Sequence, residues 1–381
     1  MKAIILRELG SPERFEGVDL PIRPPKSDEV LVQIKAGSIN PIDCKMREGR
    51  IEAPLPIVLG HDCAGLVAAI GHDVRRFREG DEVWVYLGGP CSNGAYAEFT
   101  TVPHQFVSLK PHNLTLLEAA AIPVVGLTAF MAVKYKATPA VEDSVFVAGG
   151  SGGLGSIAIQ LLQTFGISQL ITTAGSEENV MYLRERFHLP ANQIIRYEGR
   201  SRKDLAAEAI EKNGGRLFTK LLDFVGGDMK RLCFDLVAFD GEIVSVVEEI
   251  DPFAVPLWHG RLSPLFRKSA TLHFFSLAAR GLYGEQESWA PYYQDLEHLL
   301  WMFEQRRFRP VKMENLGNLS KETIAHGHTR LETGLVQGKL VFTVGQHHRA
   351  HQSLSHVGRS KRDVDLGRRP RPKHDSLEPV H

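Results

Sequence analysis

One segment limits the possible fold more than any other part of the chain. A β-branched, apolar run at residues 145–148 leads directly into a glycine-rich turn at residues 149–155, and a sequence with helical periodicity follows. Gly150, Gly152 and Gly155 match the pattern G-x-G-x-x-G. Such a turn between a strand and a helix brings backbone N–H groups and the helix dipole to a diphosphate. We therefore predict a dinucleotide-binding unit here, against the alternative of a glycine turn without a ligand.

The sequence changes character near residue 116. Before this point, short apolar runs alternate with Gly, Pro, Asp and Asn, which predicts an all-β, barrel-like domain. After it, strand-like and helix-like segments alternate, which predicts a parallel sheet with helices on its faces. The expected strands are 29–34, 65–70, 81–85, 144–148, 170–173, 221–224, 242–247 and 339–344. The expected helices are 116–121, 127–134, 156–165, 179–187, 292–303 and 320–333, with a break at Pro123.

Composition argues against several kinds of partner. The chain of 381 residues has a formal net charge of zero, which is not typical of a general polyanion-binding protein. No apolar run approaches the roughly 18 residues that a membrane-spanning helix needs, and the first residues lack an apolar signal segment. The four cysteines form no CxxC pair. A reduced, cytoplasmic protein without membrane or nucleic-acid partners is the simplest interpretation.

Residues 346–381 differ from the rest of the chain. They contain six of the sixteen histidines, few large apolar residues and the run Arg-Arg-Pro-Arg-Pro-Lys. Such a segment buries too little apolar surface to become ordered, so we predict a disordered, basic, His-rich tail. A metal-binding or polyanion-binding appendage is the alternative.

The strand after the glycine turn indicates which dinucleotide would bind. In a dinucleotide-binding domain, an acid at the end of this strand binds the 2′-hydroxyl of NAD, and its absence leaves room for a 2′-phosphate. Here the strand ends in the small, neutral residues 172–176, and Glu177 and Glu178 follow. The small tip favours NADPH, whereas the two acids leave NADH as an alternative.

Several segments, in chain order, resemble one protein family. Residues 40–49 resemble the N-P-x-D-x-x-x-R-x-G motif of the quinone oxidoreductases, the zeta-crystallin group of the medium-chain dehydrogenase/reductase superfamily. Residues 59–83 resemble that superfamily's G-x-E/D-x-x-G-x-V and G-D-x-V elements, and residues 94–98 its G-x-Y-A-E element. Residues 118–128 and 331–341 resemble its E-A-A-x-x-P-x-x-G-x-T and L-E-x-G-x-x-x-G-K-x-V segments.

This resemblance implies a fold and a set of contacts. The fold is a GroES-like barrel domain, residues 1–124 and 275–345, with an inserted Rossmann-type domain, residues 125–274, that contains a doubly wound parallel sheet. The substrate would bind between these domains, and a homodimer joined at sheet edges is also implied. Tyr197 resembles the tyrosine that lines the 2′-phosphate pocket of NADPH-using members. The implied cofactor contacts are Thr128, Gly152, Gly153, Leu154, Ser176, Tyr197, Val247 and Lys339.

The zinc-dependent alcohol dehydrogenases of the same superfamily provide the main alternative. Their catalytic zinc is held by a histidine and two cysteines, with a glutamate nearby. In this chain Asn40 stands at the position of the first cysteine and no cysteine aligns with the second, whereas His61 and Asp62 match the histidine and the acid. Cys44 and Cys63 are close in sequence and offer substitute ligands. Because tetrahedral zinc needs three converging protein ligands, we predict no metal.

Without a metal, the acceptor must tolerate weak activation of its carbonyl group. Quinones and α,β-unsaturated carbonyl compounds do so, because hydride addition to the conjugated carbon gives a delocalised anion that water can protonate. We therefore predict an NADPH-dependent quinone or enone reductase in which positioning of the nicotinamide supplies most of the rate.

Asn40 is the predicted catalytic residue, which would orient the acceptor oxygen or the nicotinamide ribose. An ordinary Asn-Pro turn is the structural alternative for this residue. A zinc-assisted alcohol dehydrogenase and a non-enzymatic nucleotide-sensing or RNA-binding protein are the alternative functions.

Overall fold

The computed structural model describes residues 1–249, 257 and 259–345, so the predicted tail at residues 346–381 lies outside the described residues. The strands are β1 (Lys2–Leu6), β2 (Phe15–Asp19), β3 (Glu29–Ile39), β4 (Asp62–Ile70), β5 (Glu82–Tyr86), β6 (Phe99–Pro103), β7 (Val107–Leu109), β8 (Val145–Ala148), β9 (Leu170–Ala174), β10 (Ile194–Arg196), β11 (Phe218–Asp223), β12 (Val237–Ser245), β13 (Thr271–Phe274), β14 (Met313–Asn318) and β15 (Lys339–Thr343).

The helices are α1 (Pro41–Arg47), α2 (Leu116–Ala120), α3 (Pro123–Ala132), α4 (Gly153–Thr164), α5 (Glu177–Phe187), α6 (Arg202–Lys212), α7 (Gly227–Leu236), α8 (Ala279–Tyr283), α9 (Ala290–Glu304) and α10 (Lys321–Glu332). The longest of these described helices, α9, has 15 residues. Within the described ranges, no helix combines the length and the apolar character that crossing a membrane requires.

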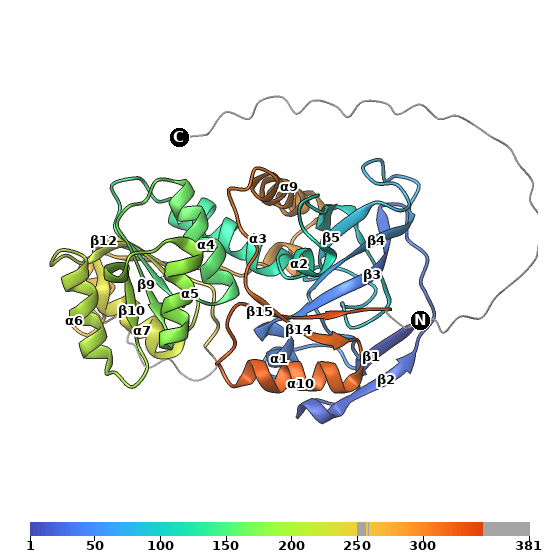
Figure 1. Cartoon of the computed structure of the whole chain (residues 1–381), viewed down its shortest axis with the longest axis horizontal. Coiled ribbons are helices and arrows are strands. Elements are labelled where there is room, and N and C mark those ends of the chain that lie inside the picture. The colour runs from blue at the N-terminus through green and yellow to red at the C-terminus, as the bar shows by residue number, and fades with distance from the viewer. Residues whose placement is uncertain (250–256, 258, 346–381) are drawn as a thin grey trace, which may run out of the picture. The chain divides into compact units, whose positions relative to one another are not determined.

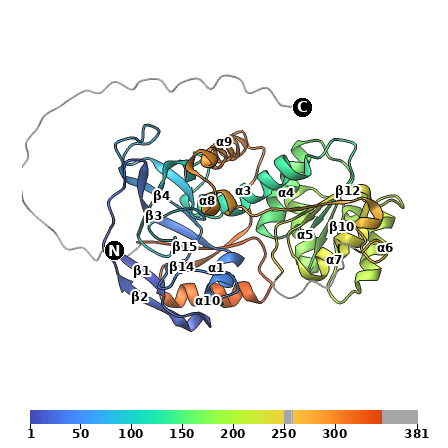
Figure 2. The same ribbon diagram turned by 180° about the vertical axis from the view of Figure 1, so that it is seen from behind.

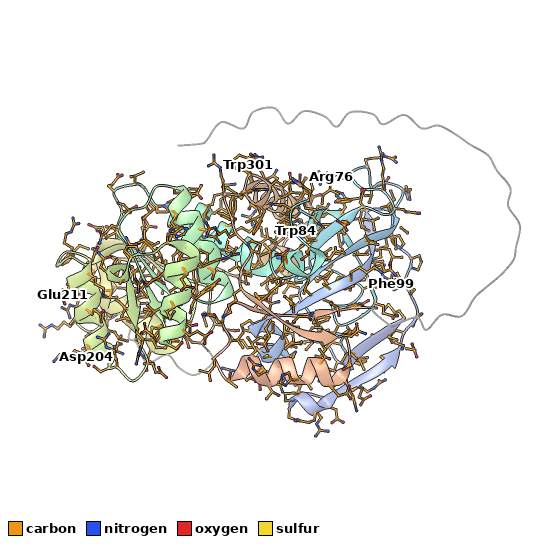
Figure 3. All side chains as sticks on the ribbon, viewed as in Figure 1. Arg76, Trp84, Phe99, Asp204, Glu211 and Trp301 are labelled. Atoms are coloured by element: carbon orange, nitrogen blue, oxygen red, sulfur yellow. The ribbon has the colours of Figure 1, made fainter. Side chains whose placement is uncertain are left out.

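A seven-stranded, mostly antiparallel sheet forms the barrel part of the fold, and Figure 1 shows its first strands in blue. The strands follow the order β14-β15-β3-β4-β5-β7, and β6 pairs with β3 as well. The long strand β3 is central because it pairs with β4, β6 and β15 along its length. The core of this part contains Trp84, which is fully buried and labelled in Figure 3. The predicted strands at residues 29–34, 65–70 and 81–85 therefore pair in one barrel-like sheet, whereas β1 and β2 form a separate antiparallel pair.

The last two strands of the described chain, β14 and β15, belong to the same sheet as β3 and β4. Leu340 of β15 pairs antiparallel with Ile39 of β3, and β14 pairs parallel with β15. Helix α10 contacts α1 and β2. Figure 2, which shows the molecule from behind, has β14, β15 and α10 in orange among the blue N-terminal elements. The chain thus leaves this sheet after β7 and returns to it at β14.

A six-stranded parallel sheet occupies the middle of the chain, in the order β10-β9-β8-β11-β12-β13. Alternate side chains of a strand point to opposite faces. In β8, Val145 and Val147 pack into the apolar core that includes α4, whereas Phe146 and Ala148 pack into a second core that includes residues of α6 and α7. Both faces of this sheet are therefore covered, as a parallel sheet requires. The predicted fold class, a GroES-like barrel plus a Rossmann-type parallel sheet, is confirmed.

Several element boundaries differ from the prediction. Helix α4 begins at Gly153 rather than at residue 156, and β12 begins at Val237 rather than at residue 242. The helix predicted at residues 127–134 begins at Pro123, because proline is favoured in the first turn of a helix. Helix α6 was missed because only Leu205 and Ala209 of its residues are buried, so the sequence has little apolar periodicity.

Candidate active site at the glycine turn

The glycine turn after β8 is packed so closely that side chains would not fit at two of its positions. A Cβ atom on Gly155 would lie 2.2 Å from the carbonyl oxygen of Gly149, and one on Gly150 would lie 2.2 Å from Oγ1 of Thr172. Gly149 has a φ of 85°, which glycine adopts without strain. Three of the glycines thus allow β8, β9 and α4 to approach each other.

The first turn of α4 presents backbone donors without acceptors. The N-cap residue is Gly152, which has no side chain to accept from the helix. The first N–H group to donate within the helix is that of Ser156, which bonds to the Gly152 carbonyl oxygen at 2.9 Å. The N–H groups of Gly153, Leu154 and Gly155 come before it and are open to an anion. A Cβ atom on Gly152 would meet nothing closer than the Gly149 oxygen at 3.5 Å, so there is space above the turn. The turn therefore fits a diphosphate, with the positive end of the helix dipole behind it.

Strand β15 of the barrel lies directly against this turn. Gly338 donates its N–H to the carbonyl oxygen of Ser151 at 3.3 Å, and Gly338 and Gly152 form an isolated parallel bridge. The side-chain methylenes of Lys339 lie 3.0 Å from the position that a Cβ atom of Gly153 would take. Lys339 therefore connects the glycine turn with the interior of the barrel.

The amino group of Lys339 ends in a buried polar cluster. Its Nζ lies 2.5 Å from Oδ1 of Asn40 and 3.4 Å from Oδ2 of Asp62. The Asn40 amide donates to Asp62 at 3.0 Å, and Asp62 also accepts from the hydroxyl of Ser38 and the N–H of Val124, both at 2.7 Å. Burial lowers the pKa of Lys339, and the charges of Asp62 and Asp43 partly oppose this effect. The predicted residues Asn40 and Lys339 thus lie in direct contact.

A second pair, Asp43 and His61, lies beside this cluster. Asp43 in the first turn of α1 accepts from the N–H groups of Asn40 and Gly60, at 2.8 and 3.0 Å, and lies 2.6 Å from Nδ1 of His61. Burial tends to lower the pKa of His61, but the Asp43 charge outweighs it and the net shift is upward. For Asp43, burial tends to raise the pKa, and His61 with the hydrogen bonds brings the net shift downward. Asp43 therefore fixes both the loop before β4 and the imidazole.

Potential metal ligands converge elsewhere. In the described ranges, one group of this kind occurs, where ligand atoms of Cys44, His328 and Glu332 lie within 4.8 Å of one another. His61 and Cys63, which the sequence suggested as partners of Cys44, are not part of this group. Burial raises the pKa of the Cys44 thiol far above its usual range, and Glu332 already pairs with Arg47. A protonated thiol is a poor metal ligand.

The predicted adenosine-binding residues line one pocket of about 340 Å³. Ser176 caps α5 by accepting from the N–H of Asn179 at 3.3 Å, and the Tyr197 hydroxyl lies 2.9 Å from the position of a Cβ atom on Gly175. Lys312 and Arg330 line the same pocket. Neither was predicted from the sequence, because both follow more than 100 residues later in the chain.

Two predicted contacts lie outside these groups. Thr128 is buried within α3, and Val247 follows the end of β12. The carbonyl oxygen of Val247 accepts from Nζ of Lys230 at 2.6 Å, and the Val247 side chain covers the turn at Gly226.

A larger surface hollow on α6 includes Asp204 and Glu211, which Figure 3 labels at the end of the molecule away from the barrel. That hollow has no part in the site described above.

Comparison with known proteins agrees with this architecture. The family model of the alcohol dehydrogenase GroES-like domain matches residues 26–112, which hold strands β3 to β7 and helix α1. The 2-methylene-furan-3-one reductase of Solanum lycopersicum is 36% identical over 210 residues, which cover 50% of this chain and 54% of that protein. The chain therefore matches about half the length of this relative. A zinc-type alcohol dehydrogenase-like protein of Staphylococcus aureus is 28% identical over 334 residues, which cover 84% of this chain and 92% of that protein.

Solved structures resemble nearly the whole described chain. The quinone oxidoreductase of Pseudomonas syringae pv. tomato superposes with a TM-score of 0.78 at 26% identity, over 90% of this chain and 99% of that one. A mycobacterial protein solved in complex with NADPH superposes with a TM-score of 0.77 at 25% identity, over 90% and 99% of the two chains. The shared fold, the matched domain and the glycine turn agree with the resemblance found in the sequence. The chain therefore contains an alcohol dehydrogenase GroES-like domain, and as a whole it resembles the quinone oxidoreductase-like group of the medium-chain dehydrogenase/reductase superfamily.

Proposed function

We propose that this protein is an NADPH-dependent reductase that transfers hydride to a small quinone or α,β-unsaturated carbonyl compound without the aid of zinc. The observation that carries the proposal is the uncapped first turn of α4, with β15 of the barrel against it. Two similar proteins support the cofactor and the reaction, since one was solved in complex with NADPH and another is named a 2-methylene-furan-3-one reductase. Bound NADPH would supply the hydride.

The residues around the turn would hold and orient the reactants. The N–H groups of Gly153, Leu154 and Gly155 would bind the diphosphate. Ser176 and Tyr197 would contact the adenosine ribose, and Thr128, Val247 and Lys339 would contact the rest of the cofactor. Asn40 is 1% exposed, its amide nitrogen donates to Asp62 and its Oδ1 accepts from Lys339, so its orientation is fixed. A side chain fixed in this way would contribute by positioning.

Zinc independence is supported by the charge that the chain itself places beside Asp62. The Lys339 ammonium contacts Asn40, which stands at the position of the first zinc-binding cysteine in the sequence resemblance, and it forms an ion pair with Asp62. A divalent cation at the same place would be repelled by this ammonium. The zinc-type name of one relative keeps the zinc-assisted alcohol dehydrogenase as the second candidate.

The proposal is tested by comparing NADPH and NADH oxidation against a panel of small quinones, enones and simple ketones, with metal analysis of the same preparation. We expect NADPH oxidation with quinones or enones and less than about 0.1 zinc per chain. Bound zinc at one per chain, with activity lost on chelation, would favour the alcohol dehydrogenase instead. NADPH binding without reduction of any acceptor would contradict the assignment as a reductase.

A further inference from the structure

We propose that Lys312, a lysine of the barrel domain, binds the 2′-phosphate of NADPH, and that this contact replaces an ion pair between Lys312 and Glu178. The inference rests on the proposed function, because it specifies how the same cofactor site would distinguish NADPH from NADH. It starts from the pocket that holds Ser176 and Tyr197.

This pocket is formed by two parts of the fold. Gly175, Ser176 and Tyr197 come from the ends of β9 and β10, whereas Lys312 and Gln337 come from the segments that precede β14 and β15. The pocket also lies at the N-terminus of α5, an 11-residue helix. The positive end of the helix dipole and a nearby ammonium both favour an anion. A pocket of about 340 Å³ has room for a ribose phosphate.

The two acids that follow Ser176 both have basic partners. Glu177 lies 3.8 Å from Arg196, and Glu178 lies 3.1 Å from Nζ of Lys312. The Glu178 side chain is 77% exposed, and the Lys312 side chain is 46% exposed. An exposed ion pair of this kind contributes little to stability, so a doubly charged phosphate can replace the carboxylate. The acids in the sequence therefore do not exclude NADPH.

Lys312 is better placed for this role than the other cation of the pocket. Arg330 is held by Glu314 through two hydrogen bonds of 2.9 Å, which occupy two of its donors. The Lys312 ammonium has three N–H donors, and in the described chain it contacts the side-chain oxygens of Glu178 and Gln337. Gln337 also donates to Oδ1 of Asn179 at 2.7 Å. Lys312 is thus held at the pocket, and its third N–H can donate to a phosphate oxygen.

The backbone fixes Lys312 relative to the glycine turn. The N–H of Lys339 donates to the carbonyl oxygen of Lys312 at 2.9 Å. Gly338, with a φ of 75°, brings the chain so close that a Cβ atom there would lie 1.9 Å from that oxygen. Lys339 is the residue that reaches from the glycine turn to Asn40. Binding of the 2′-phosphate at Lys312 would therefore hold the cofactor between the two domains.

The test is direct measurement of nucleotide binding by the full chain. We would compare the parent, Lys312→Met and the control Lys321→Met, whose lysine lies at the start of α10 and has Glu322 as its partner at 3.9 Å. Titration with NADPH and NADH, followed by nicotinamide fluorescence, gives the two dissociation constants. Displacement by adenosine 2′,5′-bisphosphate reports the phosphate contact alone. Glu178→Gln serves as a second variant.

We expect Lys312→Met to weaken NADPH binding about 10- to 100-fold, the usual range for a hydrogen bond to a charged group, and to change NADH binding less than about twofold. Lys321→Met should change neither, and Glu178→Gln should strengthen NADPH binding. Equal NADPH affinity for the parent and Lys312→Met would overturn this inference while the reductase assignment stands. A parent that binds neither nucleotide would overturn both.

Discussion

Replacing Lys339 with methionine tests whether the buried cluster depends on its built-in cation. Lys339 is 4% exposed and Asp62 is fully buried, so neither charge is well hydrated. Methionine keeps the apolar stem that packs against Gly153 but removes the ammonium. Asp62 would then keep three hydrogen-bond donors, from Ser38, Asn40 and Val124, but would lose the contact with Nζ at 3.4 Å.

The size of the effect follows from this arrangement. Removal of one partner from a buried ion pair typically costs about 3–5 kcal/mol, because a charge remains buried without a counter-ion. Since three donors still solvate Asp62, we expect the lower end of this range, about 3 kcal/mol. At about 2–4 °C per kcal/mol, the melting temperature would fall by about 6–12 °C. Adding Asp62→Asn removes the unpaired charge and should recover at least half of this loss.

Thermal unfolding followed by circular dichroism at 222 nm, at one scan rate and pH 7.5, provides the assay. The parent, Lys339→Met, the double variant and the surface control Lys321→Met would be compared. A Lys339→Met protein with the same melting temperature as the parent would refute the reasoning. So would a double variant that melts below the single one, because the loss would then not come from an uncompensated charge.

Two further predictions concern a buried histidine and the glycine turn. Burial lowers the pKa of His328 to about 4, so between this value and the unfolded value of 6.5 the unfolded chain binds more protons than the folded chain. The free energy of unfolding should therefore fall as the pH is lowered through this window. His328→Gln should flatten that part of a plot of melting temperature against pH. An unchanged slope in the variant would contradict this prediction. Gly155→Ala, whose methyl group would lie 2.2 Å from the Gly149 oxygen, should weaken NADPH binding at least about tenfold. Gly17→Ala, with no atom within 4 Å of the new methyl group, should bind as the parent does.

The sequence predicts those parts of the fold in which local pattern and burial agree. Strands β8 and β9 are short apolar runs because they are covered on both faces, and the glycine turn between β8 and α4 has a spacing that the backbone geometry requires. The start of α4 was placed too late because Gly153 and Gly155 are poor helix formers in isolation. Both glycines nevertheless lie in the first turn of the helix.

The site is predicted less completely because its residues come together only in three dimensions. Asn40 and Lys339 are adjacent in space through the pairing of β3 with β15, which no local pattern reveals. The family resemblance named both residues but not their contact. Lys312 was missed for the same reason, since its position beside Ser176 depends on the return of the chain to the barrel sheet. The sequence shows Glu177 and Glu178 beside the predicted ribose site, but it does not show that Arg196 and Lys312 pair with them.

The central claim is that the open amides in the first turn of α4 bind the diphosphate of NADPH, and Gly152→Asp tests it most directly. Gly152 has a φ of −73° and a ψ of 168°, and a Cβ atom there has no neighbour closer than 3.5 Å, so aspartate fits as an N-cap. Its carboxylate would accept from the amides that the phosphate needs and would repel the phosphate.

We therefore predict that Gly152→Asp keeps or slightly raises the melting temperature while the dissociation constant for NADPH, measured by fluorescence titration, rises at least about 100-fold. The neutral cap Gly152→Ser should weaken binding much less. A Gly152→Asp protein that is as stable as the parent and binds NADPH equally tightly would contradict the account.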